Sequence, residues 1–198
     1  MVCLDRWEVE TVFDMLPSPE SRESLMVASE PTSLDLRRLY DEYRDLVRRA
    51  VIRLGGPRQD AEDLIHEVFV IAAARLGTFR GESQPSTWLY GICVKVVCHA
   101  RRKERWLGLF QRGETPELPT YDSPHRHFEQ REAAEICYRI LNQLSEKKRT
   151  VFVLFELEQL TGEEIAIALD CPLKTVWTRL HHARKEFVQH LERSGVRS

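Results

Sequence analysis

The chain has 198 residues, enough for one or two small domains, and its hydrophobic content of 42% supports a folded core. Its net charge of −2 argues against a protein that coats nucleic acid non-specifically. No apolar run approaches the roughly 18 residues that a membrane span needs. The N-terminus is acidic and lacks the basic start of a signal peptide, so we expect a cytoplasmic protein.

The five cysteines are odd in number and widely spaced, and no CxxC pair occurs. Neither a disulfide framework nor a thiolate zinc site is therefore expected, and we predict no metal and no cofactor. The chain also lacks a phosphate-binding loop and a nucleophile elbow, which disfavours an enzyme.

The first helical pattern begins after an acidic extension. Residues 1–33 hold 2 basic and 7 acidic residues with weak periodicity, and they predict a mostly disordered segment. From residue 34 apolar side chains recur at spacings of three and four until Gly55-Gly56-Pro57 ends the helix. A second helix is expected over residues 60–76, with Asp60 as its cap.

The second helix carries a polar ridge. Asp63, His66 and Glu67 do not fit its apolar stripe, and such charges most often form a solvated helix face. Beside exposed Phe69 and Val70, an acidic ridge could instead dock a basic partner helix. Composition leaves both interpretations open.

The loop over residues 78–87 and the third helix, to about residue 106, combine aromatic and basic side chains. Ser86 or Thr87 can cap this helix. Residues 79–106 hold 6 basic and 2 acidic residues. Aromatic faces can stack on unpaired bases while cations follow the backbone, which is the chemistry of single-strand binding. Helical aromatics are usually core residues, and we interpret Trp88 as mainly core.

A proline- and glycine-containing segment, residues 107–127, predicts a flexible linker. Helical periodicity resumes at about residue 128, and strand-like alternation is absent from the sequence. The fold class is therefore all-α, with two small helical domains, residues 34–106 and 128–192, joined by the linker; residues 193–198 form a tail.

Residues 161–185 predict a helix-turn-helix. Thr161 and Glu164 have the spacing of a capping box, and Asp170-Cys171-Pro172 ends the first of the two helices. Residues 129–170 hold 5 basic and 9 acidic residues, whereas residues 174–198 hold 6 and 2. This charge separation favours a helix that enters a DNA major groove over an ordinary helical hairpin.

Three motifs in this order resemble the sigma-70 family, and most closely its compact extracytoplasmic-function (ECF) group. They are DAEDL with EVF, the FRGES to TWLY block, and LTGEEIAIAL with TVWTRLHHARK. The resemblance covers about residues 34–106 and 128–192. It implies a sigma factor that binds core RNA polymerase and directs promoter recognition, DNA opening and transcription initiation. It also implies an anti-sigma factor as partner, and contacts with the clamp coiled coil and the flap of the polymerase.

The resemblance also implies three sets of site residues. The polymerase-docking set is Asp63, His66, Glu67 and Phe69. The set for the minus-ten element is Phe79, Arg80, Ser83, Ser86, Trp88, Lys95, Arg101, Arg102 and Arg105. The set for the minus-thirty-five element is Lys174, Thr175, Thr178, Arg179, His182, Arg184 and Lys185. Within the last set, Arg179 is suited to a bidentate contact with guanine.

Two rival interpretations predict different features. A helix-turn-helix transcriptional regulator with an N-terminal sensor domain would have a ligand cavity within residues 34–106. A metal or redox sensor would use cysteines and histidines such as Cys93, Cys98 and Cys137. Cys93 and Cys98 lie about 140° apart around a helix, which is poor for sharing one ion, so buried cysteines are the expectation.

Overall fold

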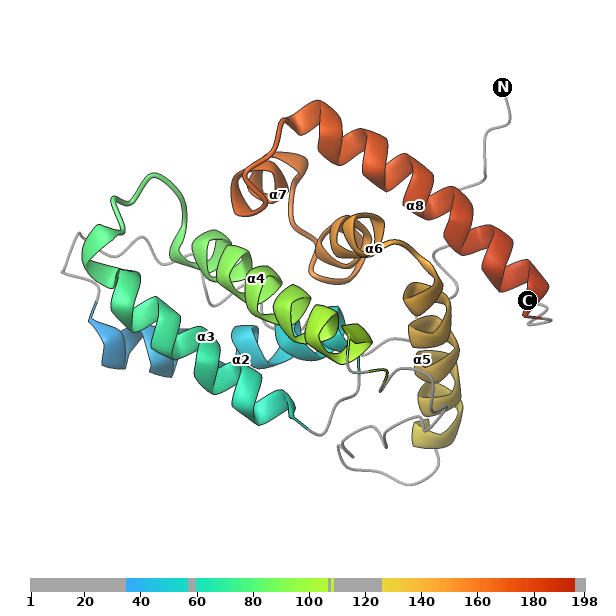
Figure 1. The fold of residues 1–198 in the computed structure, drawn as a ribbon, viewed down its shortest axis with the longest axis horizontal. Coiled ribbons are helices and arrows are strands. Elements are labelled where there is room, and N and C mark those ends of the chain that lie inside the picture. Colours follow the sequence, from blue (N-terminus) through green and yellow to red (C-terminus); the bar gives the residue numbers. More distant parts are fainter. Residues whose placement is uncertain (1–34, 57–59, 107, 109–125, 195–198) are drawn as a thin grey trace.

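The computed structural model describes residues 35–56, 60–106, 108 and 126–194, with side chains from residue 134 onward in the last range. The N-terminal extension and most of the expected linker lie outside these ranges. The described part is helical and without strands, as predicted (Figure 1). An N-terminal unit comprises α2 (Leu36–Gly55), α3 (Ala61–Arg75) and α4 (Pro85–Trp106). A C-terminal unit comprises α5 (Arg126–Gln143), α6 (Glu146–Phe152), α7 (Gly162–Ala168) and α8 (Leu173–Arg193).

The N-terminal unit is a three-helix bundle in which each helix contacts the other two. The apolar stripe predicted for the first helix is buried, with Leu39, Val47 and Val51 at 0% exposure. Gly56 ends α2 with φ of 81°, and its N–H donates to the carbonyl of Ile52 at 2.8 Å. Glycine adopts this left-handed conformation without the steric cost that a side chain would bring.

Two of the predicted caps differ in the structure. Asp60 occupies the N-cap position of α3, but its side chain makes no capping hydrogen bond. The third helix begins at Pro85, so neither Ser86 nor Thr87 caps it, and Thr87 is buried within the first turn. Proline is well suited to the first helical position, because its missing N–H has no partner there.

In the C-terminal unit, α6 packs against α8, and the rings of Phe152 and Phe187 stack at 4.8 Å between centroids. After α6 the chain forms a π-helical turn, Val153–Leu157. The predicted capping box of α7 is confirmed: the Glu164 N–H donates to Thr161 Oγ1, and the Thr161 N–H donates to the Glu164 carboxylate. Asp170, in the turn before α8, has φ of 47°.

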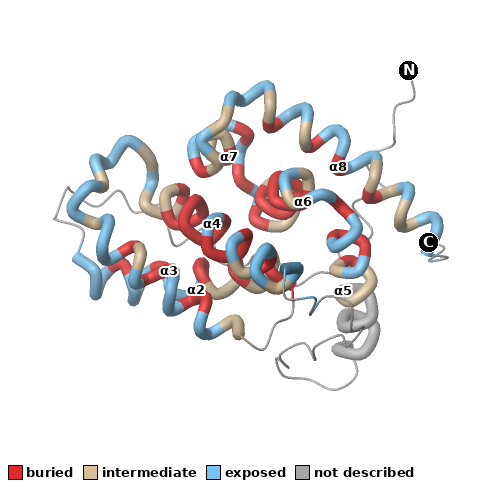
Figure 2. Tube along the Cα trace, in the orientation of Figure 1, coloured by how far each residue is buried: buried red, intermediate tan, exposed pale blue. Residues whose placement is uncertain are grey.

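The two units pack directly on one another. Helix α7 packs against α4 (Figure 1). The π-helical turn contacts α2. Buried residues line the facing sides of α4 and α6, so one hydrophobic core runs through both units (Figure 2). The sequence predicted two domains but not this contact between them.

Candidate nucleic-acid interface

A hollow of about 290 Å³ opens at the loop that precedes α4. The rings of Phe79 and Trp88 form its aromatic side, 5.1 Å apart and tilted by 43°, and both residues are half-buried. Gly81 turns the loop with φ of 70°. The lining is completed by polar residues that could address a base edge: Thr78, Arg80, Glu82 and Ser83. Of the predicted minus-ten set, this loop therefore gathers Phe79, Arg80, Ser83 and Trp88.

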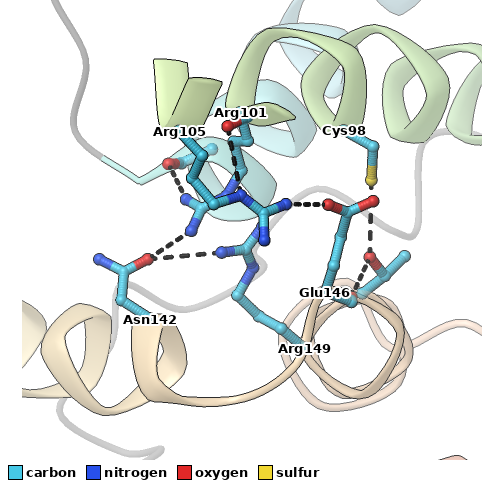
Figure 3. A network of polar contacts seen from close by, with 8 residues as sticks. Cys98, Arg101, Arg105, Asn142, Glu146 and Arg149 are labelled. Atoms are coloured by element: carbon cyan, nitrogen blue, oxygen red, sulfur yellow. Dashed lines mark hydrogen bonds and ion pairs between the residues drawn. The ribbon is translucent and has the colours of Figure 1, made fainter. Parts of the chain in front are cut away.

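The remaining minus-ten residues lie along α4 and differ in exposure. Lys95 and Arg102 are exposed on its outer side, and Ser86 is half-buried in its first turn. Arg101 is only 7% exposed, and its guanidinium donates to the carbonyl of Gly55 and to Asn142 Oδ1. Arg105 pairs with Glu146 of the C-terminal unit (Figure 3). Arg101 therefore faces protein, whereas Arg105 is ion-paired but remains exposed.

The predicted docking ridge lies on the outer face of α3. Asp63, His66 and Glu67 are all exposed, as expected of a surface that meets a partner. Phe69 is buried at 6% exposure, with its ring 4.7 Å from that of Tyr40, so the expectation that its side chain is exposed is wrong. Burial of the Phe69 ring between α2 and α3 removes its apolar surface from water and so stabilises the packing of the two helices. Val70 is 53% exposed, as expected, and is the apolar neighbour of the ridge.

Helix α8 presents a basic face at its N-terminal half. Four of the predicted minus-thirty-five residues are exposed on it: Lys174, Thr178, His182 and Lys185. The buried side of the same helix carries Val176, Leu180, Ala183 and Phe187. His181 is also exposed, with its ring 5.5 Å from that of His182, and was missed from the sequence. His181 follows Lys174 by seven residues, about two helical turns, so the two side chains lie on the same face of the helix. This spacing was the signal in the sequence that would have placed His181 on the basic face.

The other three predicted residues lie at the margins of this face. Thr175 is half-buried. Arg179 is half-buried, and its guanidinium lies 3.9 Å from Cys171 Sγ in the turn. Arg184 pairs with Glu156, and its guanidinium carbon lies 5.2 Å from the centroid of the Phe155 ring.

Three of the described cysteines are buried in the core, as the sequence predicted. Cys93, Cys98 and Cys137 are buried, and burial raises the pKa of the Cys98 thiol to about 11 and that of Cys137 to about 12. No cluster of three metal-ligating side chains occurs among the residues whose side chains are described. The metal or redox interpretation thus gains no support from this part of the chain. Likewise, none of the described helices has the length and apolar character to cross a membrane.

Because only a thiolate is nucleophilic, these pKa values predict slow reaction of the buried thiols. At pH 8, Cys98 and Cys137 should each react with iodoacetamide at least about 100-fold more slowly in the native protein than in the unfolded chain, since a pKa raised by two units lowers the thiolate fraction about 100-fold. Peptide mass spectrometry of the native and the urea-unfolded protein measures each rate. Equal rates for Cys98 in the native and unfolded protein would contradict this placement.

Comparison with protein-family models gives two matches. Residues 39–107 match Sigma-70 region 2, and residues 134–187 match Sigma-70, region 4. The first match covers the loop hollow and the docking ridge, and the second covers the basic face of α8. The alternative of a regulator with an N-terminal sensor domain is not favoured, because the N-terminal unit matches region 2.

Individual relatives agree with these matches. The RNA polymerase sigma-H factor of Pseudomonas aeruginosa is 31% identical over 160 residues, covering 76% of this chain and 83% of the relative. The ECF RNA polymerase sigma-E factor of Haemophilus influenzae is 33% identical over 156 residues, covering 74% and 82%. Among solved structures, the fold resembles the sigma factor RpoE from Bartonella quintana in complex with the anti-sigma factor NepR, at a TM-score of 0.62 and 19% identity; the match covers 80% of this chain and 97% of that one.

Proposed function

Because the chain belongs to the extracytoplasmic-function group of the sigma-70 family of RNA polymerase sigma factors, we propose distinct roles in promoter recognition for its exposed surfaces. As a sigma factor it binds core RNA polymerase and directs it to promoters. The observation that carries the assignment of roles is the presence, in one chain, of an aromatic hollow and a basic helix-turn-helix. The first suits an unpaired base and the second suits duplex DNA.

The hollow before α4 captures an unstacked base of the minus-ten element. Phe79 and Trp88 offer ring surfaces for stacking, and Ser83 and Arg80 offer hydrogen-bonding groups for the base edge. Lys95 and Arg102, exposed on α4 beyond the hollow, neutralise the phosphates of the neighbouring backbone. Capture of a flipped base stabilises the opened strand, which is how binding contributes to promoter melting.

The basic face of α8 reads the minus-thirty-five element in the major groove. Lys174 and Lys185 contact phosphates, while Thr178 and His182 lie on the same exposed face and reach base edges. Arg179 contacts a guanine after its side chain turns from Cys171 toward the groove, a rotation about single bonds. We expect no catalytic activity, because each of these roles is one of binding.

The ridge of Asp63, His66 and Glu67 docks core polymerase, with Val70 as its apolar neighbour. Charge complementarity calls for a basic surface on the clamp coiled coil. The resemblance to a sigma factor solved with its anti-sigma factor supports the proposal of an anti-sigma partner here. We place the protein in the cytoplasm, at the nucleoid, because its proposed partners are polymerase and promoter DNA.

Reversing the charge of the ridge tests the docking role. Asp63→Arg should reduce binding to core polymerase at least tenfold, because it places a cation against a basic partner surface. Affinity is measured by fluorescence anisotropy of the labelled chain with purified core enzyme. The matched control is Glu192→Arg, an equal charge change at an exposed site on the last turn of α8. Unchanged affinity in Asp63→Arg, with circular dichroism as in the wild type, would contradict the assignment.

Two substitutions in α8 separate base reading from phosphate binding. On a promoter selected from a random library with the holoenzyme, Arg179→Ala should weaken binding by about 1–3 kcal/mol and relax preference at one base pair. Lys185→Ala should weaken binding to all sequences to a similar extent and reduce the salt dependence. Both are measured by competition binding across single-base variants of the promoter. An unchanged base preference in Arg179→Ala would remove Arg179 from the reading set.

A further inference from the structure

The start of α8 carries an apolar surface to which the proposed roles assign nothing. Trp177 is 44% exposed, and Leu173, about one helical turn before it, is 36% exposed. Tryptophan is on average a well-buried residue, because its ring loses much apolar surface to the core. Two large apolar side chains exposed together therefore indicate a contact with a partner.

Trp177 borders the basic face of α8. Residues three and four apart are neighbours on a helix surface, so Trp177 lies beside Lys174 and His181. Both of these neighbours are exposed. Trp177 is also the fifth residue of α8, and in a helix-turn-helix the N-terminal residues of the second helix contact base edges. The exposed part of the ring thus adjoins the surface proposed to enter the major groove.

The first helix of the helix-turn-helix holds the ring in place. Helices α7 and α8 meet here, on either side of the turn (Figure 1). A Cβ on Gly162, the first residue of α7, would lie 2.6 Å from Cζ2 of Trp177 and 3.0 Å from Cδ1 of Leu173. A Cβ is essentially never found closer than 3.0 Å to such an atom, so glycine at this position is what lets the indole lie against α7.

Phe155 supports the ring from another side. Its centroid lies 5.6 Å from that of Trp177 with the rings at 71°, an edge-to-face arrangement that aromatic pairs prefer. Phe155 belongs to the π-helical turn, and the guanidinium of Arg184, which pairs with Glu156, lies over its ring. A side chain fixed in this way loses little conformational entropy when it meets a ligand.

An indole ring at this place can read one feature of a base pair. The major groove displays hydrogen-bonding groups for every base pair, and the apolar group that it displays is the C5-methyl of thymine. An apolar side chain that touches this methyl favours thymine over cytosine without making a hydrogen bond. A protein partner could also cover the ring, but the exposed Lys174 and Lys185 on the adjoining face suit the phosphates of DNA.

We propose that Trp177 is a specificity-determining residue of α8, which packs against the methyl group of one thymine in the minus-thirty-five element and so selects thymine at that base pair. Trp177 and Arg179 lie about 160° apart around the helix, so they reach different base pairs. The apolar contact therefore adds a second read position to the guanine contact of Arg179. The proposal rests on the proposed role of α8 as the reader of this element.

Removing single methyl groups from the promoter tests this directly. In the upstream element of a promoter selected with the holoenzyme, each thymine is replaced in turn by deoxyuridine, which keeps the hydrogen bonds of the base pair and lacks only the methyl. One of these replacements should weaken binding of the wild-type holoenzyme about fourfold, the effect of returning one buried methyl group to water. Competition binding against the unmodified promoter measures this penalty.

Variants of Trp177 identify the residue that makes the contact. The penalty should disappear in Trp177→Ala. It should also disappear in Trp177→Lys, whose methylene chain can still cover Gly162 if the alanine variant fails to fold. Trp177→Phe keeps an aromatic ring and should keep part of the penalty. The matched control, Trp106→Ala, removes a tryptophan that is 93% exposed at the end of α4, and it should keep the whole penalty.

The proposal is overturned if no thymine of the upstream element shows a penalty, or if the penalty persists in the folded Trp177 variants. A loss of affinity for core polymerase in Trp177→Ala, with the penalty unchanged, would also overturn it, since the ring would then contact protein. Failure of the proposed role of α8 would appear differently. In that case neither base changes in the upstream element nor Lys185→Ala would alter binding of the holoenzyme.

Discussion

One buried carboxylate, set into the hydrophobic core that the two helical units share, connects the units of the described chain. Glu158 is enclosed between two helical units, and its three hydrogen-bond donors come from the unit to which it does not belong. Burial, followed by the nearby Glu158 charge, raises the pKa of Tyr90 far above its ordinary value, so its hydroxyl stays protonated and donates. Without these donors the buried carboxylate would lack hydrogen-bond partners, which carries a large desolvation cost.

The same contact connects fold to function. The first turns of helix α4 border the aromatic hollow, and Gly91 packs against Ala168 of α7. Near the end of α4, Arg101 donates a hydrogen bond to Asn142 and Arg105 pairs with Glu146, both in the C-terminal unit. Helix α4 therefore belongs both to the proposed minus-ten surface and to the interface that holds α8 close by.

Features that depend on local sequence were predictable. The capping box of Thr161 and Glu164, the helix end at Asp170-Cys171-Pro172 and the all-α class follow from spacing and turn chemistry, and all are found in the structure. Features that depend on tertiary contacts were not. Phe69 is buried because Tyr40 packs on it from another helix, and Arg101 faces protein because α5 brings Asn142 to it. Periodicity within one helix carries no information about which neighbouring element will cover a marginal position.

The coupling between Glu158 and Tyr90 tests the central claim most directly, through a double-mutant cycle of Glu158→Gln and Tyr90→Phe. The free energy of unfolding of the full chain is measured by urea denaturation for the wild type, both single variants and the double variant. If the buried hydrogen bond holds the two units as one body, the double variant should be less destabilised than the sum of the single variants by at least about 1 kcal/mol. Additivity within about 0.3 kcal/mol would contradict the account, because the two side chains would then contribute independently.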